Sequence, residues 1–259
     1  MDYTTIAVAD NGPIRTIVLN RPERRNAVTP KMQMELIAAL EATASSTCRV
    51  VVLSGAGEAF CSGLDLSALE GMKEETAIEH RTDAERIARL FLSLHELPMP
   101  TIAAVHGPAI AGGCGLATIC DFTLATPSSK FGFTEVRIGF VPAVVSAFLS
   151  LQIGDKRSRD LLLTGRILTA EEARQLGLVT EVVPQEKLVE RVESLAATLI
   201  ANSPQSLAAT KQLMIDQHKA WLDVALIAAI EANTQARATS DFREGIAAFL
   251  EKRKPKWPA

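Results

Sequence analysis

The sequence predicts an α/β protein, with a core of alternating strands and helices followed by a helical C-terminal region. Strand-like and helix-like segments alternate up to residue 183, and the chain beyond Gln185 has a helical pattern throughout. We therefore expect a core at residues 1–200, carrying the functional site, and a helical oligomerisation region at residues 201–259. A mean hydropathy of +0.15, high for a soluble monomer, favours surface buried between subunits.

The first elements follow from alternation and turn chemistry. Residues 14–19 alternate like a strand and end at the turn signal Asn20-Arg21-Pro22. Thr29 before Pro30 is typical of a helix start, and apolar residues then recur at helical spacing. The apolar run in 49–54 is short enough for a strand buried on both faces.

The remaining elements alternate in the same way. Thr169 and Glu172 have capping-box spacing at the start of one expected helix. Proline and glycine mark most of the other boundaries. The further strands are expected at 102–106, 122–125 and 179–183, and the helices at 73–97, 114–120, 144–153, 156–163 and 169–176, with later breaks at Ser203-Pro204 and near Thr239-Ser240.

Charge and composition exclude several classes of protein. The formal net charge is -3, so nothing global attracts nucleic acid or an anionic membrane. An anionic ligand must be held by local basic clusters, at residues 21–25 and 252–256. No run of 18 or more apolar residues occurs, and Asp2 stands where a targeting segment would be basic. We expect a cytoplasmic protein that binds neither nucleic acid nor membranes.

The four cysteines, Cys48, Cys61, Cys114 and Cys120, form no CxxC pair and have no histidine at zinc-ligand spacing. We expect buried free thiols in a reducing compartment and no metal site.

Two glycine-containing loops, residues 59–66 and 109–114, each follow an expected strand. Such loops can present free backbone N–H groups to a developing negative charge, the second with help from a helix dipole. One loop alone is more often a simple turn, but two together predict an anion-stabilising site.

Glu135 stands in the apolar segment 131–142. Desolvation there would raise the pKa of its carboxyl group, as a proton shuttle near neutral pH requires. The alternative is a strand glutamate that faces solvent or pairs with Arg137.

Six segments in order resemble the crotonase superfamily, the enoyl-CoA hydratase/isomerase family. They are NRPERRNA at 20–27, AFCSGLDL at 59–66, HGPAIAGGCGLATICDF at 106–122, FGFTEVRIGFVP at 131–142, LLLTGRILTAEEARQLGLV at 161–179 and EGIAAFLEKRKPKW at 244–257. The resemblance covers nearly the whole chain. It implies a spiral of repeated β-β-α turns, with a C-terminal α-helical region that builds homotrimers, often paired into hexamers.

The resemblance also implies the site. The amides of Leu64 and Gly112 would stabilise the thioester oxyanion, with Gly63 and Gly113 permitting close backbone approach, and Glu135 would move protons. Coenzyme A would be part of the substrate, so no separate cofactor is expected. The residues implied to bind this acyl-CoA substrate are Arg24, Arg25, Ala27, Ser62, Gly63, Gly113, Gly115, Phe249 and Lys252.

Gly115 departs from the family pattern, because hydratases of the family carry a second catalytic glutamate at that position. A single glutamate favours double-bond isomerisation over hydration. Two alternatives stay open: a true enoyl-CoA hydratase of fatty-acid or amino-acid degradation whose water is oriented by another group, and a catalytically impaired CoA-binding scaffold. Cys114 could attack a thioester, but no motif places a histidine to activate it.

Overall fold

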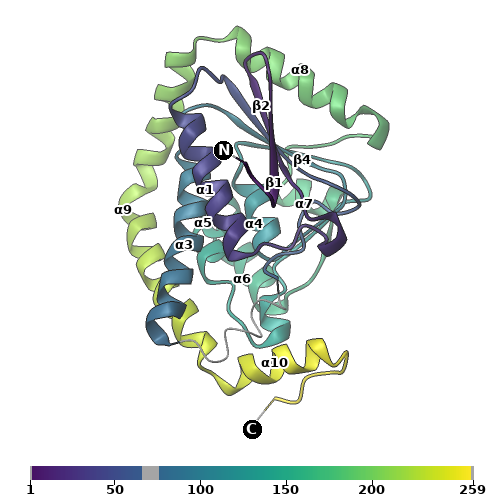
Figure 1. The fold of residues 1–259 in the computed structure, drawn as a ribbon, viewed down its shortest axis with the longest axis vertical. Helices are drawn as coiled ribbons and strands as arrows, with labels where there is room; N and C mark the ends of the chain where they lie inside the picture. The colour runs from purple at the N-terminus through teal and green to yellow at the C-terminus, as the bar shows by residue number, and fades with distance from the viewer. Residues whose placement is uncertain (1, 66–75, 258–259) are drawn as a thin grey trace.

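The computed structural model describes residues 2–65 and 76–257. Its main sheet has six strands in the order β1-β2-β3-β4-β6-β9 (Figure 1). The spatial order of the strands is therefore the same as their order along the chain. β1 and β2 pair antiparallel, and the remaining neighbours pair parallel. The bounds are β1 (Ile6–Asn11), β2 (Ile14–Leu19), β3 (Val50–Gly55), β4 (Thr101–Val105), β6 (Phe122–Ala125) and β9 (Glu181–Val182).

Helices connect and cover these strands. The alternation of strands and helices up to residue 183, followed by helices alone, confirms the predicted α/β class. Residues 73–75 of the first long expected helix lie outside the described residues. The helices are η1 (Pro22–Arg24), α1 (Pro30–Ala44), α3 (Ala77–His95), α4 (Gly112–Ile119), η3 (Glu135–Ile138), α5 (Ala143–Ile153), α6 (Asp155–Thr164), α7 (Ala170–Leu176), η4 (Gln185–Lys187), α8 (Leu188–Ala201), α9 (Pro204–Arg237) and α10 (Ser240–Leu250).

The sequence signals for helix starts are confirmed. The Thr29 side chain accepts a hydrogen bond from the N–H of Met32, which satisfies one orphan donor of α1. Thr169 and Glu172 form the full capping box of α7. The predicted breaks also begin helices, with Ser203 capping α9 and Thr239 capping α10.

A second, three-stranded sheet was not predicted. It joins β5 (Pro108–Ile110), β7 (Lys130–Gly132) and β8 (Leu168–Thr169) in that order. β5 and β7 pair parallel, with Ala109 opposite Phe131. These strands of two or three residues are too short to show the alternation from which a strand is recognised.

Both faces of the main sheet are buried, as expected for β3. Val50 and Val52 face one side and pack with Leu188 and Val192 of α8. Val51, with alternate residues of the neighbouring strands, faces the other side and joins the larger core. Because successive side chains of a strand point to opposite faces, an unbroken apolar run is what a doubly covered strand needs.

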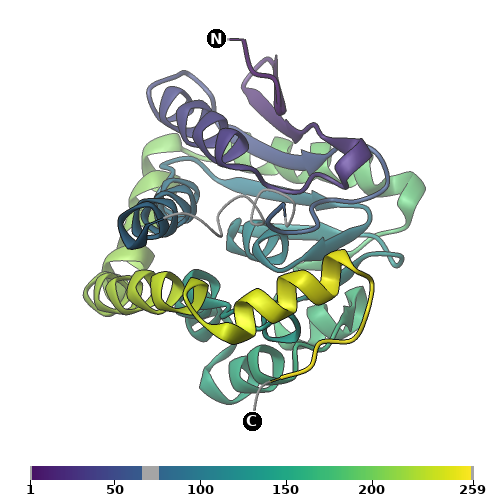
Figure 2. The same ribbon diagram turned by 60° about the horizontal axis from the view of Figure 1, so that its bottom comes forward.

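The C-terminal helices lie against the rest of the chain. α9 runs along α3 and α5 (Figure 1), and its Leu222 and Leu226 belong to the main core. α10 lies at the lower end of the molecule in Figure 1 and runs across the front in Figure 2, and its Phe242 packs on Phe140 with ring centroids 4.9 Å apart. In the described ranges, no helix is sufficiently long and apolar to span a membrane.

Candidate active site

The fold brings the two glycine loops into contact. The N–H of Ile110 donates to the carbonyl of Cys61 at 2.9 Å, and the N–H of Cys61 donates to that of Pro108 at 3.1 Å. Gly63 has a φ of +90°, and a Cβ on it would lie only 2.9 Å from the Cβ of Ala111. A side chain would therefore push the loops apart, which explains the glycine.

The amides of Leu64 and Gly112 are both available in this arrangement. The parallel bridge of Leu64 with Val28 uses the carbonyl of Gly63 and the N–H of Asp65, so the Leu64 N–H faces the opposite side. Gly112 begins α4, where a backbone N–H has no partner within the helix. Across the described part of the chain, neither amide donates a backbone hydrogen bond.

Ala111, directly before Gly112, is strained. Its φ of 52° and ψ of -128° lie outside the regions that an alanine normally adopts. Its N–H donates to the carbonyl of Gly132 at 2.7 Å, and its own carbonyl accepts from Gly115 at 3.1 Å. These bonds hold the turn that presents the Gly112 amide, and strain of this kind concentrates at functional sites.

Glu135 is the first residue of η3, and its carboxyl group is buried. Its Oε2 atom has no hydrogen-bond partner within residues 2–65 and 76–257. Burial raises the pKa of Glu135 from 4.5 to about 7. Glu135 is 8% exposed and so does not face solvent, and its Oε2 atom makes no pair with Arg137, which is also a described residue. The segment is also a 3-10 helix instead of a strand.

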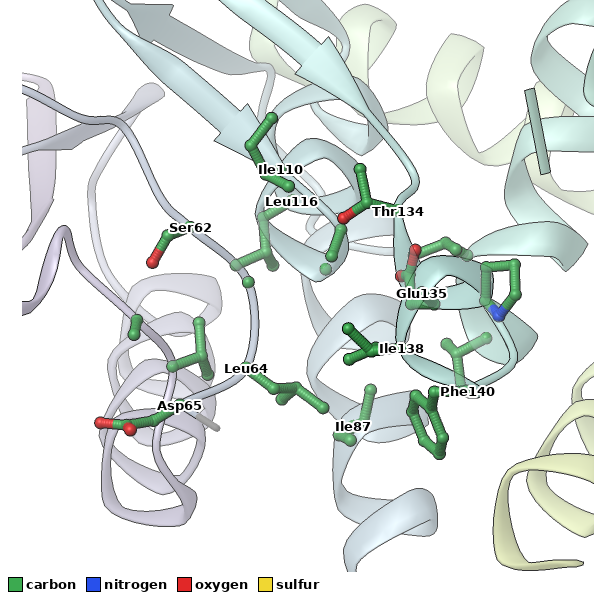
Figure 3. Close-up of a pocket in the computed structure, with 18 of the residues that line it drawn as sticks. Ser62, Leu64, Asp65, Ile87, Ile110, Leu116, Thr134, Glu135, Ile138 and Phe140 are labelled. Carbon is green, nitrogen blue, oxygen red and sulfur yellow. The ribbon is translucent and has the colours of Figure 1, made fainter. Parts of the chain in front are cut away.

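Leu64, Gly112 and Glu135 line one cavity of about 550 Å³. Figure 3 shows Leu64 and Glu135 on different walls of this cavity, with Ile138 and Phe140 close to Glu135. Apolar side chains form most of the remaining wall: Val28, Ile87, Leu90, Phe91, Ile110, Leu116, Val141, Val144 and Val145. The cavity therefore combines an apolar lining with a proton-accepting carboxyl group and two free amides.

The predicted substrate-binding residues divide into two groups. Arg24, Arg25, Ala27, Ser62, Gly63 and Phe249 line the cavity. Arg24, Arg25 and Phe249 are exposed, so they form its mouth. Lys252 and Gly113 do not line it. A Cβ on Gly113 would lie 2.4 Å from the carbonyl oxygen of Cys61, so this glycine serves the contact between the loops.

Gly115 is also absent from the cavity wall. A Cβ at this position would lie 2.6 Å from both Phe91 Cε1 and Val145 Cγ1. These two side chains line the cavity themselves, so they occupy the space between Gly115 and the cavity. Where the family pattern has a carboxylate, this chain has apolar atoms.

Asn26 is a positioning residue that the sequence did not reveal. Its buried side chain donates to the carbonyls of Ala56, Ala59 and Phe60, at 2.8, 2.8 and 3.2 Å, and accepts from the N–H of Arg21. Asn26 therefore connects the basic cluster at residues 21–25 to the first glycine loop. The available signal was the residue type, because asparagine adopts left-handed backbone more readily than most residues, and Asn26 has a φ of 55°.

The surroundings of two other side chains near the loops, Asp65 and Cys114, indicate structural roles. Asp65 accepts a hydrogen bond from Arg21 Nη1 at 2.9 Å, and residues 66–75, which follow it, lie outside the described residues. Cys114 is buried, does not line the cavity, and has its pKa raised by desolvation. A thiol of this kind is a poor nucleophile.

A strained turn with two free amides and a buried carboxyl group of raised pKa line the same cavity, an arrangement that can stabilise an oxyanion and move a proton beside it. Comparison with known proteins gives the family. The sequence profile described as enoyl-CoA hydratase/isomerase matches residues 9–259, and the chain belongs to this family of acyl-CoA enzymes. The predicted resemblance to the crotonase superfamily is thereby confirmed.

Individual relatives agree with this family. A candidate enoyl-CoA hydratase of Thermus thermophilus is 43% identical over 249 residues, which are 96% of this chain and 98% of the relative. The 2,3-dehydroadipyl-CoA hydratase of Escherichia coli is 35% identical, with 92% of each chain covered. A crystal structure of an enoyl-CoA hydratase/isomerase from Xanthobacter autotrophicus Py2 matches with a TM-score of 0.90 at 30% identity and covers 100% of both chains.

Proposed function

We propose that the chain is a double-bond isomerase of enoyl-CoA that uses Glu135 as its single acid/base group. The observation that carries this proposal is the Glu135 carboxyl group, whose unpaired Oε2 and pKa of about 7 suit it to accept and return a proton. The apolar filling between Gly115 and the cavity supports the choice of isomerisation, because it leaves no room for a second carboxylate there.

The reaction needs no group beyond those in the cavity. Glu135 as carboxylate removes a proton from C2 of a 3-enoyl-CoA, and the electrons move into a dienolate whose thioester oxygen accepts from the Leu64 and Gly112 amides. The protonated Glu135 then delivers the same proton to C4, which gives the 2-enoyl-CoA. The amides lower the barrier because the negative charge is largest on the thioester oxygen during this transfer.

Hydration of a 2-enoyl-CoA is the second candidate, favoured by the names of the relatives. The proteins of Thermus thermophilus and Escherichia coli are both named as hydratases. In this reaction Glu135 would share the handling of water with a group other than residue 115. A CoA-binding scaffold is a third reading, but the Glu135 carboxyl group and the two free amides together support catalysis.

The deciding experiment assays pure protein on a 3-enoyl-CoA and a 2-enoyl-CoA in parallel, following the absorbance of the conjugated enoyl group. We expect this absorbance to increase with the 3-enoyl-CoA and to decrease little with the 2-enoyl-CoA. Glu135→Gln should reduce turnover by at least about a hundredfold while acyl-CoA affinity stays nearly unchanged. Faster hydration than isomerisation would select the second candidate, and inactivity on both would select the scaffold.

We also propose that the protein is a homotrimer or a hexamer, with residues 201–259 building the contact. α9 carries exposed apolar side chains that a second subunit would cover: Leu213, Met214, Trp221, Val224 and Ile227. Light scattering combined with size-exclusion chromatography measures the assembly, and a stable monomer would contradict this proposal.

A further inference from the structure

Two buried amide side chains interrupt the apolar wall of the cavity. Gln33 of α1 is 1% exposed and Asn233 of α9 is 4% exposed, and both line the cavity. In contrast with exposed Arg24 and Arg25 at the mouth, these two belong to its interior. The mechanism proposed above uses neither of them.

Two arginines fix the orientation of these amides. Arg86 Nη1 donates to Gln33 Oε1 at 3.3 Å, and Arg237 Nε donates to Asn233 Oδ1 at 3.1 Å. Since a guanidinium has only donors, each amide must turn its oxygen to the arginine and its NH₂ group away from it. Asp83 of α3 binds both arginines, and so joins the two amides into one network.

Most of the network is buried. The Arg237 side chain is 0% exposed, and its guanidinium lies 5.8 Å from the ring centroid of Phe140, a cavity residue. Three helices, α1, α3 and α9, contribute to it. Its members are therefore held by packing as well as by charge, which is how a binding group is kept in one geometry.

The NH₂ groups of both amides have no hydrogen-bond acceptor among the described residues. Both NH₂ groups are open to the cavity, where water or an acceptor atom of a bound molecule pairs them. The surrounding wall, with Ile87 of α3 as one member, suits a hydrocarbon chain.

We propose that Gln33 and Asn233 determine substrate specificity by binding an oxygen acceptor on the acyl group, at a distance from the thioester. The substrate class is an acyl-CoA whose hydrocarbon chain carries a carboxylate, ester or other acceptor oxygen. This inference rests on the proposed function, because it takes the cavity to be the acyl-binding site.

Saturated CoA thioesters test the inference without any turnover. Isothermal titration calorimetry compares butyryl-, hexanoyl- and octanoyl-CoA with succinyl-, adipyl- and suberyl-CoA, which end in a carboxylate. The monomethyl esters of the second set separate a charged acceptor from a neutral one. At one chain length or more, we expect an oxygen-bearing ligand to bind at least about tenfold more tightly than its methyl-ended partner.

Gln33→Glu and Asn233→Asp are the matched variants. Each retains an oxygen that accepts from its arginine but replaces the NH₂ donor, so the network can still form. The preference for oxygen-bearing ligands should disappear in both variants, and methyl-ended ligands should change less. Gln185→Glu, on exposed η4, is the control for added charge and should retain the preference.

The outcomes are distinct. Equal binding of the two ligand sets by the native protein, or a preference that survives in both variants, would overturn the inference and leave the enoyl-CoA activity standing. If no CoA thioester binds, the proposed function fails and this inference fails with it. Thermal unfolding of each variant establishes that it is folded at the titration temperature.

Discussion

Replacing Glu135 by glutamine is expected to stabilise the protein at alkaline pH and to leave its stability unchanged at acidic pH. Burial raises the pKa of Glu135 from 4.5 to about 7, so the folded protein holds this proton more tightly than the unfolded chain. Stability contributed by this proton is present below pH 4.5 and is lost as the pH rises through about 7. Glutamine has nearly the same shape and carries no charge at any of these pH values.

The size of the effect follows from the pKa change. A rise from 4.5 to about 7 corresponds to about 3 kcal/mol, at about 1.4 kcal/mol for each tenfold change in proton affinity. For a chain of this size, that should raise the melting temperature of the variant above that of the native protein by roughly 6 to 12 °C at high pH.

Differential scanning fluorimetry on both proteins, from about pH 4.5 to about pH 8.5, gives the difference in melting temperature at each pH. Glu186→Gln, at an exposed position on η4, is the control and should show no such trend. If the difference in melting temperature between Glu135→Gln and the native protein were the same at every pH, the reasoning would be refuted. Ionisation of the Glu135 carboxyl group would then not lower the stability of the folded protein.

Four further outcomes are expected. The kcat/KM of the native protein for a 3-enoyl-CoA should rise with pH through about 7, as the basic form of Glu135 appears, and a profile without that limb would contradict its role as base. Asn26→Ala removes three donated hydrogen bonds and should cost about 3 kcal/mol in urea unfolding, with a larger loss in kcat than in binding. Gly245→Ala places a Cβ 2.0 Å from the carbonyl oxygen of Ile138 and should cost about 1–3 kcal/mol together with activity; unchanged turnover would show that α10 does not support η3. Gly115→Glu should destabilise the fold by about 1–3 kcal/mol through its clash with Phe91, seen as a lower melting temperature, before any gain in hydration can appear.

The long elements could be predicted from the sequence because their signals are local. Pro30 after Thr29 locates the start of α1, and the apolar run in β3 reports that both faces of its sheet are covered. In each case, the residues that form the element also carry its signal. The short strands β5, β7 and β8 are defined only by their partners across space, which no local pattern records.

The site was predictable to a similar extent. Both glycine loops and Glu135 could be found from their residues, since glycine and an isolated carboxyl group stand out in apolar segments. The contribution of Gln33 and Asn233 could not, because they are 200 residues apart and are joined only through Arg86, Asp83 and Arg237. Asn26 belongs to the segment NRPERRNA at 20–27, but its role depends on three carbonyls that the fold brings to it.

The packing of α10 on η3 has a consequence for the order in which the protein is made. Every strand of the main sheet is complete by residue 182, and Glu135 is synthesised well before that. Yet the contacts that close around η3, Gly245 against Ile138 and Asp241 against Gly139, come from α10. On the ribosome, a chain with its whole main sheet formed would therefore still lack the helix that supports the Glu135 segment. We expect acid/base activity to appear only when this last helix has emerged, so the main sheet forms before the protein becomes active.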